Sequence, residues 1–346
     1  TLSRYCDFLI RGSEIWCIRE TTSGHETHRD LIAITAQGDI RTLDSDSHFY
    51  AHLALSPDKN SLAWISWEHP QMPWDGTELR VAKISSDGVL ENCTVVAGST
   101  TEAVNSPVWA NDETLYYLSD KSGFWNIWEN SNLGKNRQVL VEAAEWAHPM
   151  WQVGTNLLRI LPDGRLVGIH GSPAAEKVAI VDPTSGRVVD CESELSNFSH
   201  ISVHDNQVFA IGGGAKVPAA MVEFSATTAA TATTLIDVEL PVAASYFPTA
   251  RSVSFPSKNG RAVHAFISTA TNPDFESDEK PPVIITAHGG PTGNTTGVAA
   301  IRRAFFTSRG FTVVDVDYGG STGYGRAYRE TLKGQWGVGD TEDILA

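Results

Sequence analysis

Residues 281–321 read PPVIITAHGGPTGNTTGVAAIRRAFFTSRGFTVVDVDYGGS, and this stretch decides the fold of the C-terminal part of the chain. Residues 283–287 form a short apolar run rich in β-branched side chains, and residues 311–316 form a second one. Between them, apolar residues at helical spacing predict a helix over 298–308. Strand, glycine-rich loop, helix and strand in this order predict a βαβ unit, and therefore a parallel sheet.

The loop after the first of these strands contains the motif HGGP, which begins at His288. Gly289 and Gly290 lack a Cβ, so the backbone there can turn sharply and bring an N–H close to a ligand. Acyl-transfer enzymes need such donors for the developing oxyanion, and an HGG-type loop at this point of an α/β-hydrolase sheet supplies one. The alternative is a βα turn that merely needs glycine, and the motif alone does not decide between the two.

The sequence around the motif resembles a known family. HGGP at 288–291, followed by SRGFTVVDVDYGGSTGYGRAYRETLKGQWGVGDTEDILA at 308–346, resembles the start of the catalytic domain of the prolyl oligopeptidase family of serine peptidases. The acylaminoacyl-peptidase and dipeptidyl-aminopeptidase branch is the most similar. The resemblance is dense over 250–346 and looser over 56–79 and 116–129.

The resemblance implies roles for two residues of the motif. The backbone N–H of Gly290 would be one oxyanion donor, and the second would come from the residue after the nucleophilic serine. His288 would shape the loop or line the site, although a lone histidine at a strand end is as often structural. Two departures from the family's pattern leave fine specificity open: Asp317 replaces a frequent Asn, and the Tyr-Gly-Gly at 318–320 replaces Tyr-Arg-Gly.

A catalytic triad is not recognisable in the sequence. A serine hydrolase of this fold has Ser, Asp or Glu, and His in chain order, with the serine at G-x-S-x-G. Gly320-Ser321-Thr322-Gly323 comes nearest to that pattern, and Gly319 completes its spacing, but it follows the wrong strand. The chain opens without Met and stops within a helical pattern, so we expect a piece of a longer protein. By the resemblance, the triad would lie beyond Ala346, and the chain by itself is expected to be inactive.

The first part of the chain, 1–240, is predicted to be all-β. A unit of strand, polar turn and strand recurs with its turn aspartate at Asp58, Asp112, Asp163 and Asp205. Recurrence every 40–50 residues or so is typical of a β-propeller, whose blades are four-stranded sheets. We expect about five blades, the first incomplete, and the resemblance implies seven in the intact protein. A β-sandwich with a similar number of strands is the alternative.

The composition changes after the propeller. Residues 241–256 contain three prolines and no clear period, and are predicted to be a linker. Residues 257–346 are predicted to be the N-terminal part of an α/β-hydrolase domain. Within this region, 252–255 and 262–268 are predicted to be two strands joined by an Asn-Gly hairpin turn. Asp340 is predicted to be the N-cap of the last helix.

Charge and cysteine content restrict the class of protein. The net charge of −15 disfavours nucleic acid or an anionic membrane as a partner. No run of about 18 apolar residues predicts a membrane span. Four cysteines without a CxxC pair predict reduced thiols and, weakly, a cytoplasmic location. Neither a metal nor an organic cofactor is implied.

Two functional hypotheses follow. The first is a serine exopeptidase or oligopeptidase that takes short peptides through the propeller and cleaves them by way of an acyl-enzyme; an esterase on the same fold is a close variant. The second is a non-catalytic propeller protein that binds a partner and retains a degenerate hydrolase domain. A downstream G-x-S-x-G-G turn with a later Asp and His would separate the two. Substrate preference, exo- or endo-cleavage, and oligomeric state stay open.

Overall fold

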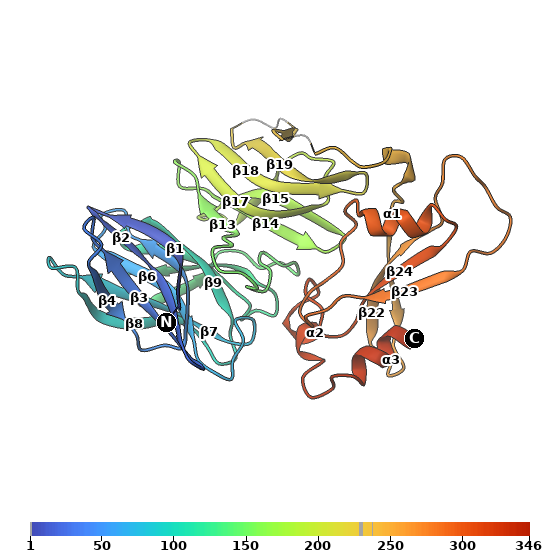
Figure 1. Cartoon of the computed structure of the whole chain (residues 1–346). Helices are drawn as coiled ribbons and strands as arrows, with labels where there is room; N and C mark the ends of the chain where they lie inside the picture. Colours follow the sequence, from blue (N-terminus) through green and yellow to red (C-terminus); the bar gives the residue numbers. More distant parts are fainter. Residues whose placement is uncertain (1, 228–230, 237) are drawn as a thin grey trace. The chain divides into compact units, whose positions relative to one another are not determined.

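A computed structural model describes residues 2–227, 231–236 and 238–346 of the chain (Figure 1). It contains two compact units. One comprises Thr1–Glu142, Pro149–Leu166 and Asp182–Arg187, and the other comprises Ala143–His148, Val167–Val181 and Val188–Ala346. The predicted domain boundaries near residues 240 and 256 remain predictions. Among the described residues, no helix is long and apolar enough to cross a membrane.

Five four-stranded sheets follow one another from the N-terminus, each built from four consecutive strands (Figure 1). The first contains β1 (Leu2–Arg11), β2 (Glu14–Ser23), β3 (Glu26–Ile34) and β4 (Ile40–Asp44). The second contains β5 (Phe49–Leu55), β6 (Ser61–Trp67), β7 (Thr77–Ile84) and β8 (Leu90–Ser99). The third contains β9 (Val104–Asn111), β10 (Thr114–Ser119), β11 (Asn126–Ser131) and β12 (Lys135–Gln138). The fourth contains β13 (Leu158–Ile160), β14 (Leu166–Ser172), β15 (Ala175–Asp182) and β16 (Arg187–Asp190). The fifth contains β17 (Asn197–His204), β18 (Gln207–Gly214), β19 (Val217–Ser225) and β20 (Thr233–Thr234).

This architecture confirms the predicted propeller with about five blades. The expectation of an incomplete first blade was wrong, because β1 completes a sheet of four strands. The sequence of β1 concealed this, since its side chains are exposed or only partly buried and its apolar residues do not alternate cleanly. Figure 1 shows the repeated sheets in chain order, from blue to yellow.

Neighbouring sheets of the first unit pack through the two faces of a shared strand. In β6, Leu62 and Trp64 lie in one apolar cluster with Trp16 of the first sheet. Ile65, on the opposite face, lies in a second cluster with Trp109 of the third sheet. Successive side chains of a strand point to opposite faces, so one buried strand serves both interfaces. This is why β6 has no polar face.

A second set of contacts joins the first strands of successive sheets. Asp7, His52 and Ser106 each have a positive φ angle, where β1, β5 and β9 change register. The Leu53 N–H donates to Asp7 Oδ2 over 3.1 Å, and the Ser106 N–H donates to His52 Nδ1 over 2.9 Å. Each bulge therefore places a side-chain acceptor against the backbone of the next sheet.

The last sheet contains the predicted βαβ unit. Its strands are β21 (Arg251–Pro256), β22 (Ala262–Ser268), β23 (Val283–Ala287) and β24 (Thr312–Asp317), in the order β21-β22-β24-β23. β21 and β22 form the predicted antiparallel hairpin, and β23 runs parallel to β24. The helix between them, α1 (Ile301–Thr307), packs against β24 (Figure 1). β23 is the outer strand, and the side chains of Val283 and Ile285 are about half exposed.

Two short helices follow β24. They are α2 (Arg326–Glu330) and α3 (Gly339–Leu345); one 3-10 turn, η1 (Ala244–Tyr246), precedes β21. The predicted N-cap of α3 was wrong: the helix begins after Val338 without a side-chain cap, and Asp340 lies in its first turn. The residue that fixes this helix is Asp343, whose buried carboxylate accepts hydrogen bonds from Arg261 and from the Gly319 N–H.

Candidate functional site

The HGGP motif lies directly after β23, as its sequence predicts. The last paired residues of the two parallel strands are Ala287 of β23 and Val316 of β24, so His288 and Asp317 leave the sheet at the same edge. The carboxyl ends of parallel strands are the usual place for ligand sites in open α/β sheets. The motif and the glycine-rich segment after β24 therefore meet where a site is expected.

The two glycines of the motif are exposed, and their roles differ. Gly290 has φ +103°, a conformation that residues with a Cβ rarely adopt. A Cβ on Gly289 would meet no atom within 4 Å, so space does not require glycine there. Among the described residues, no hydrogen bond uses the Gly290 N–H. The exposed Gly290 thus offers a backbone donor that no described residue uses.

The side chain of His288 lies inside the loop and is only 12% exposed. Its Nδ1 is 2.9 Å from the carbonyl oxygen of Gly289, and its Nε2 is 2.6 Å from Ser321 Oγ. The ring stacks on Tyr318, with centroids 4.6 Å apart, and the Tyr318 hydroxyl donates to the His288 carbonyl over 3.0 Å. Burial lowers the pKa of His288, which favours the neutral ring. The His288 side chain therefore stabilises the loop through contacts on its buried side.

Asp317 closes the other side of this cluster. Its buried carboxylate accepts hydrogen bonds from the Thr295 N–H and the Tyr324 hydroxyl, each over 2.7 Å. One carboxylate oxygen lies 3.7 Å from His288 Nε2. Burial raises the pKa of Asp317 to about 7, although the hydrogen bonds from Tyr324 and Thr295 lower it. A carboxylate at this position can therefore change its charge near neutral pH.

The glycine-rich segment after β24 is hydrogen-bonded to the HGGP loop and the turn that follows it. Thr322 donates its N–H to the Gly293 carbonyl over 2.9 Å and its hydroxyl to the Thr292 carbonyl over 2.7 Å. Ser321 is fully buried, with its Oγ between His288 Nε2 and the Tyr318 carbonyl. A nucleophile must be reachable by substrate, so this serine does not fit that role. The structure agrees with the sequence that Gly320–Gly323 is not a nucleophile turn.

The sequence indicated His288 and Gly290, but not the residues that contact the His288 side chain. Ser321 and Asp317 are 33 and 29 positions away from His288 and form no local motif with it. The only available signal was position, because Asp317 ends the neighbouring parallel strand. In the part of the chain that the structure describes, no group of three or more His, Cys, Asp or Glu side chains could hold a metal ion.

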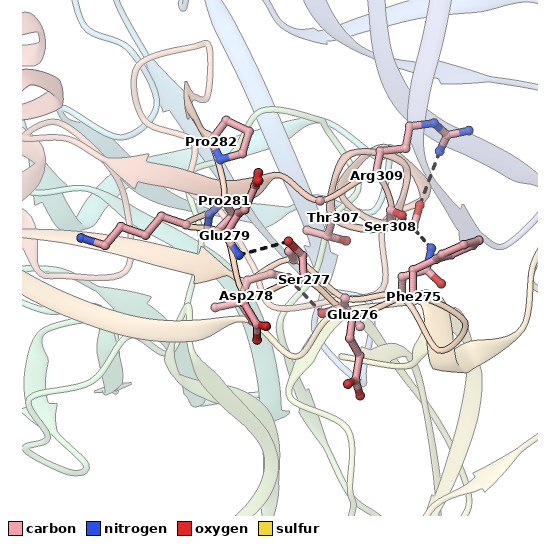
Figure 2. Close-up of a pocket in the computed structure, with 16 residues that line it drawn as sticks. Phe275, Glu276, Ser277, Asp278, Glu279, Pro281, Pro282, Thr307, Ser308 and Arg309 are labelled. Carbon is pink, nitrogen blue, oxygen red and sulfur yellow. Dashed lines mark hydrogen bonds between the residues drawn. The ribbon is translucent and has the colours of Figure 1, made fainter.

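A large cavity lies away from the HGGP motif. It measures about 960 Å³ and is bounded by the loop 269–282 and by residues 307–310. Figure 2 shows the carboxylate residues Glu276, Asp278 and Glu279 around it, with the Glu279 N–H donating to Ser277 Oγ over 3.1 Å. No residue of the HGGP motif lines this cavity. Size alone therefore does not identify the site, and the geometry at the sheet edge does.

Comparisons with known proteins agree with this geometry. The sequence model of the prolyl oligopeptidase family matches residues 298–346. Dipeptidyl-peptidase 5 of Schizosaccharomyces pombe is 36% identical over 92 residues, which are 26% of this chain and 13% of the yeast protein.

Solved structures extend the similarity along the chain. A puromycin-hydrolysing peptidase of Mycobacterium tuberculosis is 37% identical, with a TM-score of 0.94 over 99% of this chain and 55% of that one. A structure titled puromycin hydrolase is 34% identical, with a TM-score of 0.95 and the same coverage. Prolyl oligopeptidase B of Galerina marginata, at 12% identity and a TM-score of 0.78, shares the fold. The chain spans about half the length of the puromycin-hydrolysing relatives. Its repeated blades, its HGGP loop and these similarities all point to the prolyl oligopeptidase family, whose sequence model matches residues 298–346.

Proposed function

We propose that the whole protein is a serine-type peptidase that hydrolyses short peptides through an acyl-enzyme, and that the Gly290 N–H is one of its oxyanion donors. The observation that carries this proposal is the donor itself. It is exposed, has no partner among the described residues, and stands at the carboxyl end of a parallel strand. Preorganised donors of this kind stabilise the charge that develops in acyl transfer.

The chemistry follows from where this donor stands. A scissile carbonyl oxygen placed about 2.7–3.1 Å from the Gly290 nitrogen would gain its hydrogen bond as the tetrahedral intermediate forms. The attacking serine and its histidine and acid would come from sequence outside this chain. Ser321 is excluded from that role by its burial, and His288 by its contacts within the loop.

The substrate class rests on the relatives. Dipeptidyl-peptidase 5 and the puromycin-hydrolysing peptidases support a peptidase that removes one or two residues from short substrates. We therefore expect aminoacyl or dipeptidyl p-nitroanilides to be cleaved. An esterase on the same fold would prefer the matching p-nitrophenyl esters.

The test uses a fluorophosphonate probe on two proteins. The whole protein should be labelled and the 346-residue chain should not, because Ser321, which has the G-x-S-x-G spacing, is fully buried. Labelling of the 346-residue chain would refute the assignment of the nucleophile. A whole protein that is neither labelled nor active on the p-nitroanilides would refute the proposed function and favour a propeller that only binds.

A further inference from the structure

The contact between His288 and Gly289 acts on the proposed oxyanion donor. The carbonyl oxygen of Gly289 and the N–H of Gly290 belong to one peptide unit, which is not among the cis bonds of the chain. In a planar trans peptide the two groups point in opposite directions. Whatever holds the Gly289 carbonyl therefore also sets the direction of the Gly290 N–H.

The histidine ring is the group that holds this carbonyl. His288 Nδ1 lies 2.9 Å from the Gly289 oxygen, and a carbonyl can only accept, so Nδ1 must carry the proton. Among the described residues, no other hydrogen bond is made by the Gly289–Gly290 peptide unit. Both glycines are exposed and Gly289 has open space beside it, whereas Gly293 borders the contact: a Cβ there would lie 3.1 Å from the Gly289 oxygen and 3.0 Å from His288 Nδ1.

Ser321 contacts the other ring nitrogen and can donate to it when Nδ1 carries the proton. Its Oγ is 2.6 Å from His288 Nε2, and its hydroxyl can donate to that nitrogen when the ring is neutral. The hydroxyl has a competing acceptor, the Tyr318 carbonyl at 2.7 Å. When Nε2 is protonated the ring donates to Ser321, and Ser321 donates to Tyr318. In both charge states Nδ1 keeps its proton, and the Gly289 carbonyl stays bound.

The remaining neighbours fix the plane of the ring. Tyr318 stacks on it, and Asp317 lies 3.7 Å from Nε2. Asp315 and Tyr324 are the other titratable groups that interact with Asp317. None of these groups contacts Nδ1. The ring is thus held on one side by buried partners and presents its other nitrogen to the loop.

We propose that His288 is a positioning residue: its Nδ1–H aims the Gly290 N–H by binding the Gly289 carbonyl, and Ser321 selects the ring tautomer that makes this bond. Hydrogen bonding to the carbonyl also polarises the peptide and strengthens its N–H as a donor. The catalytic consequence rests on the proposed function, whereas the effect on the peptide does not.

The first experiment needs no activity. The 346-residue chain is labelled with ¹⁵N-glycine and ¹⁵N-histidine, and the Gly290 amide signal is assigned by its loss in Gly290→Ala. In the wild type, the His288 ring should be protonated at Nδ1. His288→Ala should shift the Gly290 signal and speed its hydrogen exchange, while glycine signals from other loops stay in place and show that the fold is intact. An unmoved Gly290 signal would overturn the proposal.

Ser321→Ala tests the tautomer with the ring still present. It should move His288 toward protonation at Nε2 and change the Gly290 signal in the same direction as His288→Ala. The matched control is Ser268→Ala on β22, a fully buried serine whose Oγ has no hydrogen-bond partner in the described part of the chain. That variant should leave both signals unchanged. An unchanged tautomer in Ser321→Ala would remove Ser321 from the proposal.

The second experiment uses the whole protein. His288→Gln should lower kcat about tenfold to a hundredfold with little change in KM, because a misaimed donor loses part of the roughly 10²–10³ that a lost one costs. If the whole protein hydrolyses no substrate, the proposed function fails and the amide signals still decide the role of His288. If hydrolysis is normal in His288→Gln, the positioning role fails and the function stands.

Discussion

Asp343→Ala should detach α3 from the α/β sheet. The Asp343 side chain is fully buried, and its two oxygens accept from Ser257 Oγ at 2.6 Å, from Arg261 at 2.6 and 2.8 Å, and from the Gly319 N–H at 2.7 Å. One carboxylate therefore joins the β21–β22 hairpin, the turn after β24 and the last helix. The alanine variant leaves three donors without their acceptor.

The magnitude follows from these partners. Breaking a buried ion pair by removing one member costs about 3–5 kcal/mol. The Arg261 side chain is 25% exposed and regains some hydration, which reduces this cost. The Gly319 N–H and the Ser257 hydroxyl are buried, and each unsatisfied group adds roughly 1–3 kcal/mol unless water enters. We expect a loss of about 3–5 kcal/mol in the free energy of opening this region.

Hydrogen exchange of the 346-residue chain measures the loss where it occurs. At about 1.4 kcal/mol per factor of ten, amides of 252–268 and 318–322 should exchange roughly 10²–10³ times faster in Asp343→Ala. Glu342→Gln is the control on the same helix, because Glu342 pairs with the exposed Lys258 and such pairs contribute about 0–1 kcal/mol. Exchange that is equally slow in both variants would refute this role of Asp343.

Four substitutions at three further positions test other parts of the structure. Burial raises the pKa of Asp317 to about 7, so the free energy of unfolding should fall, on the order of a few kcal/mol, as pH rises from about 4 to 7. Asp317→Asn should remove this pH dependence in urea unfolding. A pH dependence that persists in the variant would contradict the role of Asp317. Burial lowers the pKa of His52 to about 4, so the free energy of unfolding should fall as pH drops from about 6.5 to 4. In thermal unfolding, His52→Asn should reduce this dependence of stability on pH. His52→Ala should cost about 2 kcal/mol more than His52→Asn, because only Asn keeps an acceptor for the Ser106 N–H; equal costs would count against the contact. An outer strand with exposed apolar side chains favours pairing between chains, so Ile285→Lys on β23 should lower the mean mass of the 346-residue chain in light scattering; an unchanged mass would count against pairing through this edge.

Elements with local signals were predictable from the sequence. The Asn259-Gly260 turn fixed the hairpin of β21 and β22, and the apolar run of β23 has the same bounds in the sequence and in the structure. The spacing of the turn aspartates indicated the blades because each blade repeats one local pattern. These elements are determined by residues within a few positions of each other.

Contacts between distant residues were not predictable in this way. Asp340 has the residue type of an N-cap and lies near the start of α3. The helix is instead held by the hydrogen bonds of the buried Asp343 carboxylate. Ser321 has the spacing of a nucleophile motif, and its contact with His288 is evident only when β23 and β24 are paired. Pairing of parallel strands brings together residues about thirty positions apart, and one sequence contains no local sign of it.

The oxyanion loop is therefore shaped by its neighbour more than by its own glycines. Thr322 binds two carbonyls of the 292–293 turn, Asp317 binds the Thr295 N–H, and Ser321 binds His288. A loop held at these points needs little rearrangement when charge develops, and preorganisation of that kind is what makes a donor effective. Among the described residues, the Gly289–Gly290 peptide takes no part in these contacts, and the His288 ring binds its carbonyl oxygen. Variation at Asp317 or 318–320 should consequently act on rate through the loop before it acts on substrate choice.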